Sequence, residues 1–121
     1  MNTKRNKIIY YISTGLLTAS MSISILMYVF AHDVALEAFT KLGFPTFIIY
    51  PLAAAKLLGL IAIWTGKSKM LKEWAYAGFT FNLILATSAH LSIGDGEFAP
   101  ALVALILVIT SYVFNKKRTV K

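Results

Sequence analysis

One lysine stands inside a long apolar run. The segment PLAAAKLLGL, residues 51–60, contains a single cation, Lys56, and Asn82 occupies the middle of another apolar segment. Ionisable residues inside such segments usually face the protein interior and mark a functional path. We predict that Lys56 and Asn82 meet at one level and contact a ligand, an anion or a proton. In the alternative interpretation, Lys56 stretches its stem toward water or fixes helix register, and Asn82 joins two helices by a hydrogen bond.

A second group of chemistry-bearing residues lies in SAHLSIGDGEFAP, residues 88–100. We predict that His90, Asp95 and Glu97 line a polar pocket that binds a headgroup or an acidic proton donor. The alternative is purely structural, because acids offset the positive dipole at a helix start and a histidine offsets the negative one at a helix end. Three further residues are assigned to the reversal of the chain and the start of the next helix: Gly94, Gly96 and Pro100.

No intrinsic cofactor or metal is expected. A metal ion needs about three convergent nitrogen or oxygen ligands, and only the loop carboxylates with His32 and His90 offer them. The two histidines belong to outer helix ends and do not face each other across a core, which argues against a haem. The chain has no cysteine, so disulfides, thiolate nucleophiles and iron–sulfur ligation are excluded.

The composition indicates a membrane protein. Hydrophobic residues make up 58% of the 121 residues, against about 45–50% in soluble domains. The net charge of +7 does not indicate nucleic-acid binding, because the basic residues form short clusters between apolar runs and not one continuous face. The length suits a single domain, residues 1–121.

Four apolar segments approach the length of about 20 helical residues that a bilayer core of about 30 Å requires. They are residues 8–30, 46–64, 72–91 and 98–114. Between the first two, AHDVALEAFTKLGFPT mixes apolar and charged residues and predicts a short helix at the membrane interface. We expect Asp33 to cap this helix and Gly43 with Pro45 to end it. The predicted fold is all-α, a four-transmembrane-helix bundle with a short interfacial helix between helices 1 and 2.

Small residues predict how the helices pack, because close backbone approach supplies much of the contact energy between helices in lipid. Ala53, Lys56 and Gly59 share one face of residues 46–64. The matching stripes on the first and third helices are Thr14, Thr18 and Ser22, and Ala75, Gly78, Asn82, Ala86 and Ala89. Lys56 is therefore expected to face inward.

Charge predicts the orientation. Lysines and arginines gather before the first helix, between the second and third, and after the fourth, whereas four of the five acids lie in the other two connections. Basic residues collect on the cytoplasmic side. Both termini are therefore predicted to be cytoplasmic.

Two long stretches, FTKLGFPTFIIYPLAAAKLLGLIAI and LKEWAYAGFTFNLILATSAHLSIGDGEFAPAL, resemble the DoxX-like family of small bacterial four-helix membrane proteins. The resemblance implies a bundle in the bacterial plasma membrane. Relatives named DoxD form part of a thiosulfate:quinone oxidoreductase, and others are linked to membrane redox complexes. The motif positions that it marks are Lys56, His90, Gly94, Asp95, Gly96 and Pro100. The broader family more often carries an acid where this chain has Lys56.

The functional prediction follows from the residue patterns and from the family resemblance together. We expect an accessory subunit of a membrane redox system that contacts a quinone or another lipophilic ligand between Lys56, Asn82 and His90, and that is not catalytic on its own. The alternatives are a structural or chaperone-like partner of a larger membrane protein and a small transporter. The expected partners are the lipid bilayer, a membrane redox enzyme subunit or a second copy of the chain.

Overall fold

The computed structural model describes residues 3–94 and 96–119, and its regular structure is entirely helical within those ranges. The elements are α1 (Thr3–Phe30), α2 (His32–Leu42), the 3₁₀ turn η1 (Thr46–Ile48), α3 (Ile49–Thr65), α4 (Lys69–Ile93) and α5 (Ala99–Thr119). This confirms the all-α prediction. The first, third and fourth predicted helices are longer than their apolar runs, because lysine and arginine are good helix formers and continue the helix beyond the apolar part.

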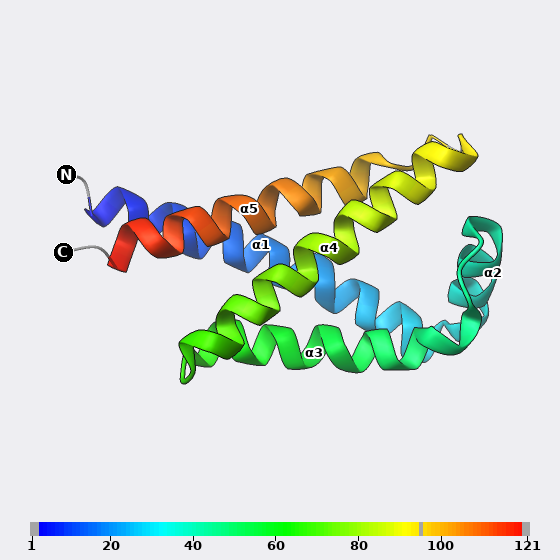
Figure 1. The fold of residues 1–121 in the computed structure, drawn as a ribbon, viewed down its shortest axis with the longest axis horizontal. Coiled ribbons are helices and arrows are strands. Elements are labelled where there is room, and N and C mark those ends of the chain that lie inside the picture. Colours follow the sequence, from blue (N-terminus) through cyan, green and yellow to red (C-terminus); the bar gives the residue numbers. More distant parts are fainter. Residues whose placement is uncertain (1–2, 95, 120–121) are drawn as a thin grey trace.

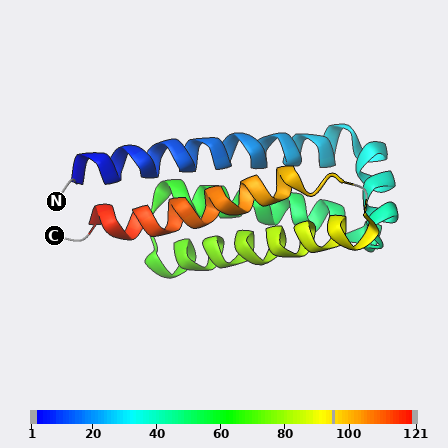
Figure 2. The ribbon, with the colours of Figure 1, turned by 90° about the horizontal axis from the view of Figure 1, so that it is seen from above.

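The four long helices lie side by side (Figures 1 and 2). Helix α1 contacts α3 and α5, and α4 contacts the same two helices. Both ends of the described chain lie at one end of the bundle, and α2 runs across the opposite end (Figure 2). The bundle thus has an end that is covered by a helix and an end that carries the termini.

The main core holds apolar side chains from all four long helices: Leu17, Met21, Leu60, Ile63, Tyr76, Phe79, Leu83, Ala104 and Val108. Large apolar side chains also point outward, among them Ile23 at 62%, Leu58 at 66% and Phe81 at 71% exposure. Exposed apolar patches of this extent mark contact with a membrane or a partner.

In the described part of the chain, three helical segments are long and apolar enough to cross a membrane: Thr3–Phe30, Thr46–Thr65 and Ala99–Arg118. Together with the outward apolar side chains, they indicate a membrane protein. Helix α4 has 25 residues, enough to rise about 37 Å, but polar residues such as Thr80, Asn82 and Thr87 lower its hydropathy. The fourth span therefore stays a prediction.

The corner around α2 corrects one prediction. Ala31, and not Asp33, is the N-cap, and Asp33 lies in the first turn. Only one residue separates α1 from α2, and the Ala31 N–H still bonds to α1 while its carbonyl accepts from Val34 and Ala35. The predicted end of the helix is confirmed. Gly43 adopts φ 85° and donates to the Thr40 carbonyl, and Pro45 is extended and leads into η1.

The turn between α4 and α5 follows the glycines. Gly94 ends α4 with φ 66°, and its N–H bonds to the carbonyls of His90 and Leu91. Gly96 has φ 76°, and Pro100 is the second residue of α5, where a missing N–H costs little. Asp95, which we assigned to a polar pocket or, in the alternative interpretation, to the start of the last helix, lies outside the described residues.

The small-residue prediction is right for α3 and only partly right for α4. Ala53 and Lys56 are buried, and Gly59 lies so close to α4 that a Cβ atom there would come within 2.9 Å of the Phe79 ring. On α4, however, the buried residues are Tyr76, Phe79 and Leu83. A Cβ at Gly78 would meet nothing within 4 Å. The small residues of α4 thus leave a space where we expected a contact.

This difference predicts opposite effects of one substitution at two glycines. Gly59→Ala should destabilise the fold by about 1–3 kcal/mol, because the Phe79 ring must move within a packed core. Gly78→Ala is the matched control, and it should be neutral or stabilise by about 0.5–1 kcal/mol. Unfolding of both variants in the same detergent measures the difference. Equal effects at both positions would contradict the close approach of α3 to α4.

Candidate ligand site

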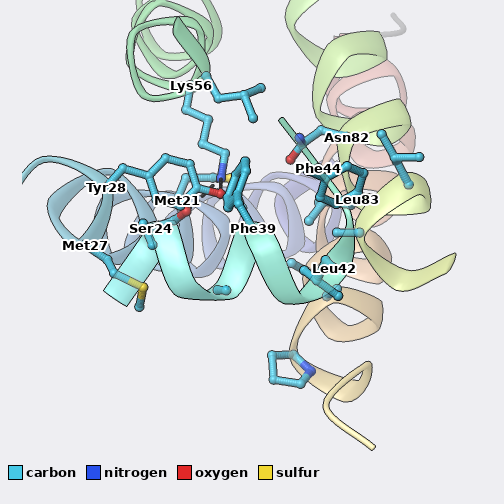
Figure 3. Close-up of a pocket in the computed structure, with 18 of the residues that line it drawn as sticks. Met21, Ser24, Met27, Tyr28, Phe39, Leu42, Phe44, Lys56, Asn82 and Leu83 are labelled. Carbon is cyan, nitrogen blue, oxygen red and sulfur yellow. Dashed lines mark hydrogen bonds between the residues drawn. The ribbon is translucent and has the colours of Figure 1, made fainter. Parts of the chain in front are cut away.

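A cavity of about 410 Å³ lies between the helices at the α2 end of the bundle. All five α-helices contribute to its wall, which is mostly apolar (Figure 3). The few polar side chains that line it are Ser20, Ser24, Tyr28, Lys56, Asn82 and His90. An apolar cavity with a few convergent polar groups is the usual form of a small-molecule site.

Lys56 is held inside the protein. Its side chain is only 6% exposed, and Nζ donates hydrogen bonds to Ser24 Oγ at 2.7 Å and to Tyr28 OH at 3.1 Å. Nζ also lies 4.4 Å from the centre of the Tyr28 ring. Phe39 of α2 packs edge-on against that ring at 5.4 Å and fixes its position. The inward orientation predicted for Lys56 is confirmed, and the alternative in which it reaches toward water is wrong.

Asn82 borders the same cavity from α4, across from Lys56 (Figure 3). The two residues therefore share one space, as predicted. Within the described part of the chain, however, the hydrogen bonds of Nζ go to α1 and not to Asn82. Sequence reasoning missed Ser24 and Tyr28. Their only signal was a spacing of four residues, which puts two hydroxyls on one face of α1.

The stripe predicted on α1 serves a different contact. Thr14 is fully buried and shares a hydrogen bond with Ser111 of α5, and Ser111 also bonds to the Tyr76 hydroxyl. Thr18 accepts a hydrogen bond from the Trp64 ring at 2.7 Å. These residues join the helices at a distance from the cavity.

The charge of Lys56 is incompletely compensated. An ammonium carries three N–H donors, and hydroxyl oxygens accept from two of them. Among the described residues, no carboxylate forms an ion pair with Lys56. A buried charge without a partner is costly, so an oxygen-bearing ligand would complete the site.

The second predicted group is only partly brought to the cavity. His90, in the last turn of α4, lines it together with Pro100. Glu97 is exposed and is absent from the lining, and Asp95 is not described. His32 lies elsewhere, stacked on Tyr50 at 4.5 Å. The described residues contain no group of three or more histidines and acids arranged to hold a metal.

A groove of about 790 Å³ runs between α3 and α4 and shares Leu52, Lys56 and Asn82 with the cavity. Small residues from both helices form much of its wall: Ala55, Gly59, Ala62, Ala75 and Gly78. Larger apolar side chains, including Leu71 and Trp74, line it toward the α3–α4 turn. Lys56 and Asn82 therefore stand where a cavity with polar groups meets a long apolar groove.

An all-helical chain with several membrane-competent helices and an enclosed lysine belongs to the class of small integral membrane proteins. The model of the DoxX-like family matches residues 12–113. The chain therefore belongs to the DoxX-like family, and the match includes the residues that line the cavity and the groove. Comparisons with curated proteins and with solved structures found no match.

The hydrogen bonds of Lys56 predict a characteristic set of stabilities. Ser24→Ala should cost about 1–3 kcal/mol, because it leaves a buried charged donor without its acceptor. Lys56→Met should be neutral or stabilising, because it removes the buried charge itself. Adding Ser24→Ala to Lys56→Met should then cost little. Unfolding in detergent measures all three variants.

Ser22→Ala is the matched control, since Ser22 is a serine of the same helix that gives no hydrogen bond to Lys56. It should change stability by less than Ser24→Ala. If Lys56→Met destabilises the protein as much as Ser24→Ala does, the lysine stabilises the fold and its buried charge is not costly.

Proposed function

We propose that this DoxX-like protein is an accessory subunit of a membrane redox system and holds the headgroup of a quinone beside Lys56. The single observation that carries the proposal is a buried lysine with one N–H lacking an acceptor in the described structure, at the junction of a cavity and an apolar groove. A quinone has both parts that such a junction fits, namely a ring with carbonyl oxygens and a long apolar tail.

The chemistry of the wall suits a carbonyl ligand. Lys56 offers a charge-assisted hydrogen bond, the stronger kind, to an oxygen that becomes more negative on reduction. Asn82 lies across the cavity from Lys56 (Figure 3), His90 also lines the cavity, and both provide further polar groups for the ring. The quinone supplies the redox chemistry. The chain itself has no cysteine, and we assign electron transfer to and from the ligand to a partner subunit.

The proposal includes a fourth membrane span formed by α4. This helix runs beside α3 and α5 (Figure 1), both of which belong to membrane-competent segments. The polar Asn82 borders the cavity and the groove, whereas Phe81 is 71% exposed toward the outside of the bundle. The low hydropathy of α4 thus reflects side chains that serve the interior.

The proposed orientation has both termini in the cytoplasm and the membrane is the bacterial plasma membrane. The basic residues at the start of α1, around the α3–α4 turn and at the end of α5 belong to the same end of the bundle (Figure 2). Helix α2, with Asp33 and Glu37, lies at the other end. The positive-inside rule assigns the basic end to the cytoplasm.

Quinone binding is tested by quenching of tryptophan fluorescence in the purified protein. Trp74 lines the groove and lies eight residues before Asn82, about 12 Å along the helix. Adding a quinone should quench it, and Lys56→Met should raise the dissociation constant about tenfold or more, the value of a charge-assisted hydrogen bond.

Lys41→Met removes the same charge from the exposed face of α2 and should leave the dissociation constant unchanged. Absence of quenching in the unmodified protein would refute the proposal that it binds a quinone. Copurification of a membrane protein regardless of Lys56→Met would then favour a structural or chaperone-like partner of that protein, and a liposome flux that depends on Lys56 would favour a transporter.

The groove predicts a dependence on the tail of the ligand. Gly78→Leu fills the groove and should weaken binding of a quinone with a prenyl tail about fivefold or more, because overpacking costs about 1–3 kcal/mol. Binding of the headgroup without a tail should not change. Ala77→Leu is the control, because Ala77 is exposed and lines neither hollow. If Gly78→Leu weakens binding of the prenylated quinone and of the headgroup alone equally, the tail does not lie in the groove.

A further inference from the structure

Two cations converge on one phenol at the end of the bundle that carries the termini. Lys72 of α4 donates from Nζ to the Tyr10 hydroxyl and to Asn115 Oδ1, each at 3.1 Å. Arg118 of α5 lies with its guanidinium carbon 4.0 Å from the centre of the Tyr10 ring and 5.6 Å from that of Tyr11. Tyr10 itself is only 2% exposed. Helices α1, α4 and α5 therefore meet in one basic and aromatic cluster.

This cluster lacks an anion within the described structure. Glu73 is nearby in sequence, but its carboxylate pairs with Lys116 at 2.9 Å. Neither Lys72 nor Arg118 forms an ion pair with a described residue. Arg118 Nε is in addition a buried donor that has no hydrogen-bond partner among the described residues. A buried donor left in this state costs about 1–3 kcal/mol, so an acceptor from outside the chain would stabilise the cluster.

We propose that Lys72 and Arg118 bind the phosphate of an anionic phospholipid. The membrane-competent segment of α5 ends at Arg118, which puts the guanidinium at the level of lipid headgroups. Tyr11 stacks on Trp64 at 6.3 Å beside it, and such rings prefer the membrane interface. The exposed face of α1 carries Ile12 and Leu16, at 59% and 54% exposure, against which the acyl chains of the lipid can lie.

Arginine suits this role because its planar fork matches phosphate oxygens, while Lys72 adds a second positive charge from another helix. The bound phosphate would link α4 and α5 through Lys72 and Arg118. This site is separate from the cavity around Lys56 and does not depend on the proposed quinone.

The test uses the full chain in nanodiscs of phosphatidylcholine alone and of phosphatidylcholine mixed with phosphatidylglycerol. Native mass spectrometry counts the lipids that stay bound, and thermal unfolding reports the stabilisation. The unmodified protein should retain phosphatidylglycerol preferentially and unfold at a higher temperature in its presence. Arg118→Gln and Lys72→Gln should each reduce that retention about fivefold, the usual effect of one basic residue near an anionic surface.

Lys69→Gln and Lys117→Gln remove the same charge at neighbouring exposed positions and should retain the lipid. Should Lys72→Gln fail to fold, since Lys72 also bridges Tyr10 and Asn115, Arg118→Gln decides alone. Equal losses in all four variants would show diffuse attraction and overturn the site. So would stabilisation of detergent-solubilised protein by inorganic phosphate that equals that by phosphatidylglycerol, because the ligand would then be a free anion.

Discussion

The structure depends on how a buried ammonium is satisfied. Removing a charged amine from water is expensive, and the cost falls only when hydrogen-bond acceptors surround it. Ser24 and Tyr28 of α1 provide two acceptors for Lys56 of α3, which fixes the rotation of one helix against the other. The two hydroxyls are neutral, so the positive charge stays without an opposite charge in the described structure. The contact that orients α1 and α3 thereby also creates an attraction for an electron-rich ligand.

The bundle is closely packed in one region and hollow in another. The large core side chains, from Leu17 to Val108, fill the space between the four long helices, and Thr14, Ser111 and Tyr76 add a buried chain of hydrogen bonds that joins α1, α5 and α4. Beside this core, the groove between α3 and α4 has small residues of both helices in its wall and extends toward the α3–α4 turn, and the cavity lies near α2. Helix α2 closes this region, because Phe39 lines the cavity and holds the Tyr28 ring. Helix α2 is therefore part of the candidate site.

The elements of the fold were predictable because length and apolarity act locally. Gly43 and Gly94 ended their helices as expected, since a positive φ is easiest for glycine. The enclosure of Lys56 was predictable from Ala53 and Gly59 on the same face. Its partners were not, because α1 carries hydroxyl residues on more than one face, and only the packing against α3 and α5 decides which of them turns inward.

The dependence on helix packing also explains the remaining differences between the sequence predictions and the structure. Small residues on α4 indicate room for a neighbour, but sequence does not say whether a helix or a cavity occupies that room. Asp33 has a good capping side chain, yet the one-residue corner after Phe30 puts Ala31 at the cap. Tertiary geometry overrides local preference at such points. The residues that line the cavity are accordingly drawn from every helix, and sequence reasoning identified Lys56, Asn82 and His90 among them.

The sign of the charge at this site bears on the proposed function. An ammonium in an apolar cavity stabilises the more negative, reduced form of a quinone relative to the oxidised one. On the proposed function, Lys56 thus raises the reduction potential of the bound ligand and favours electron flow toward it from a partner. A carboxylate-driven transporter has the opposite requirement, since its coupling group must release and regain a proton within the membrane. The described residues that line the cavity include no carboxylate, which on the proposed function favours an electron-accepting ligand over a carboxylate-driven transporter.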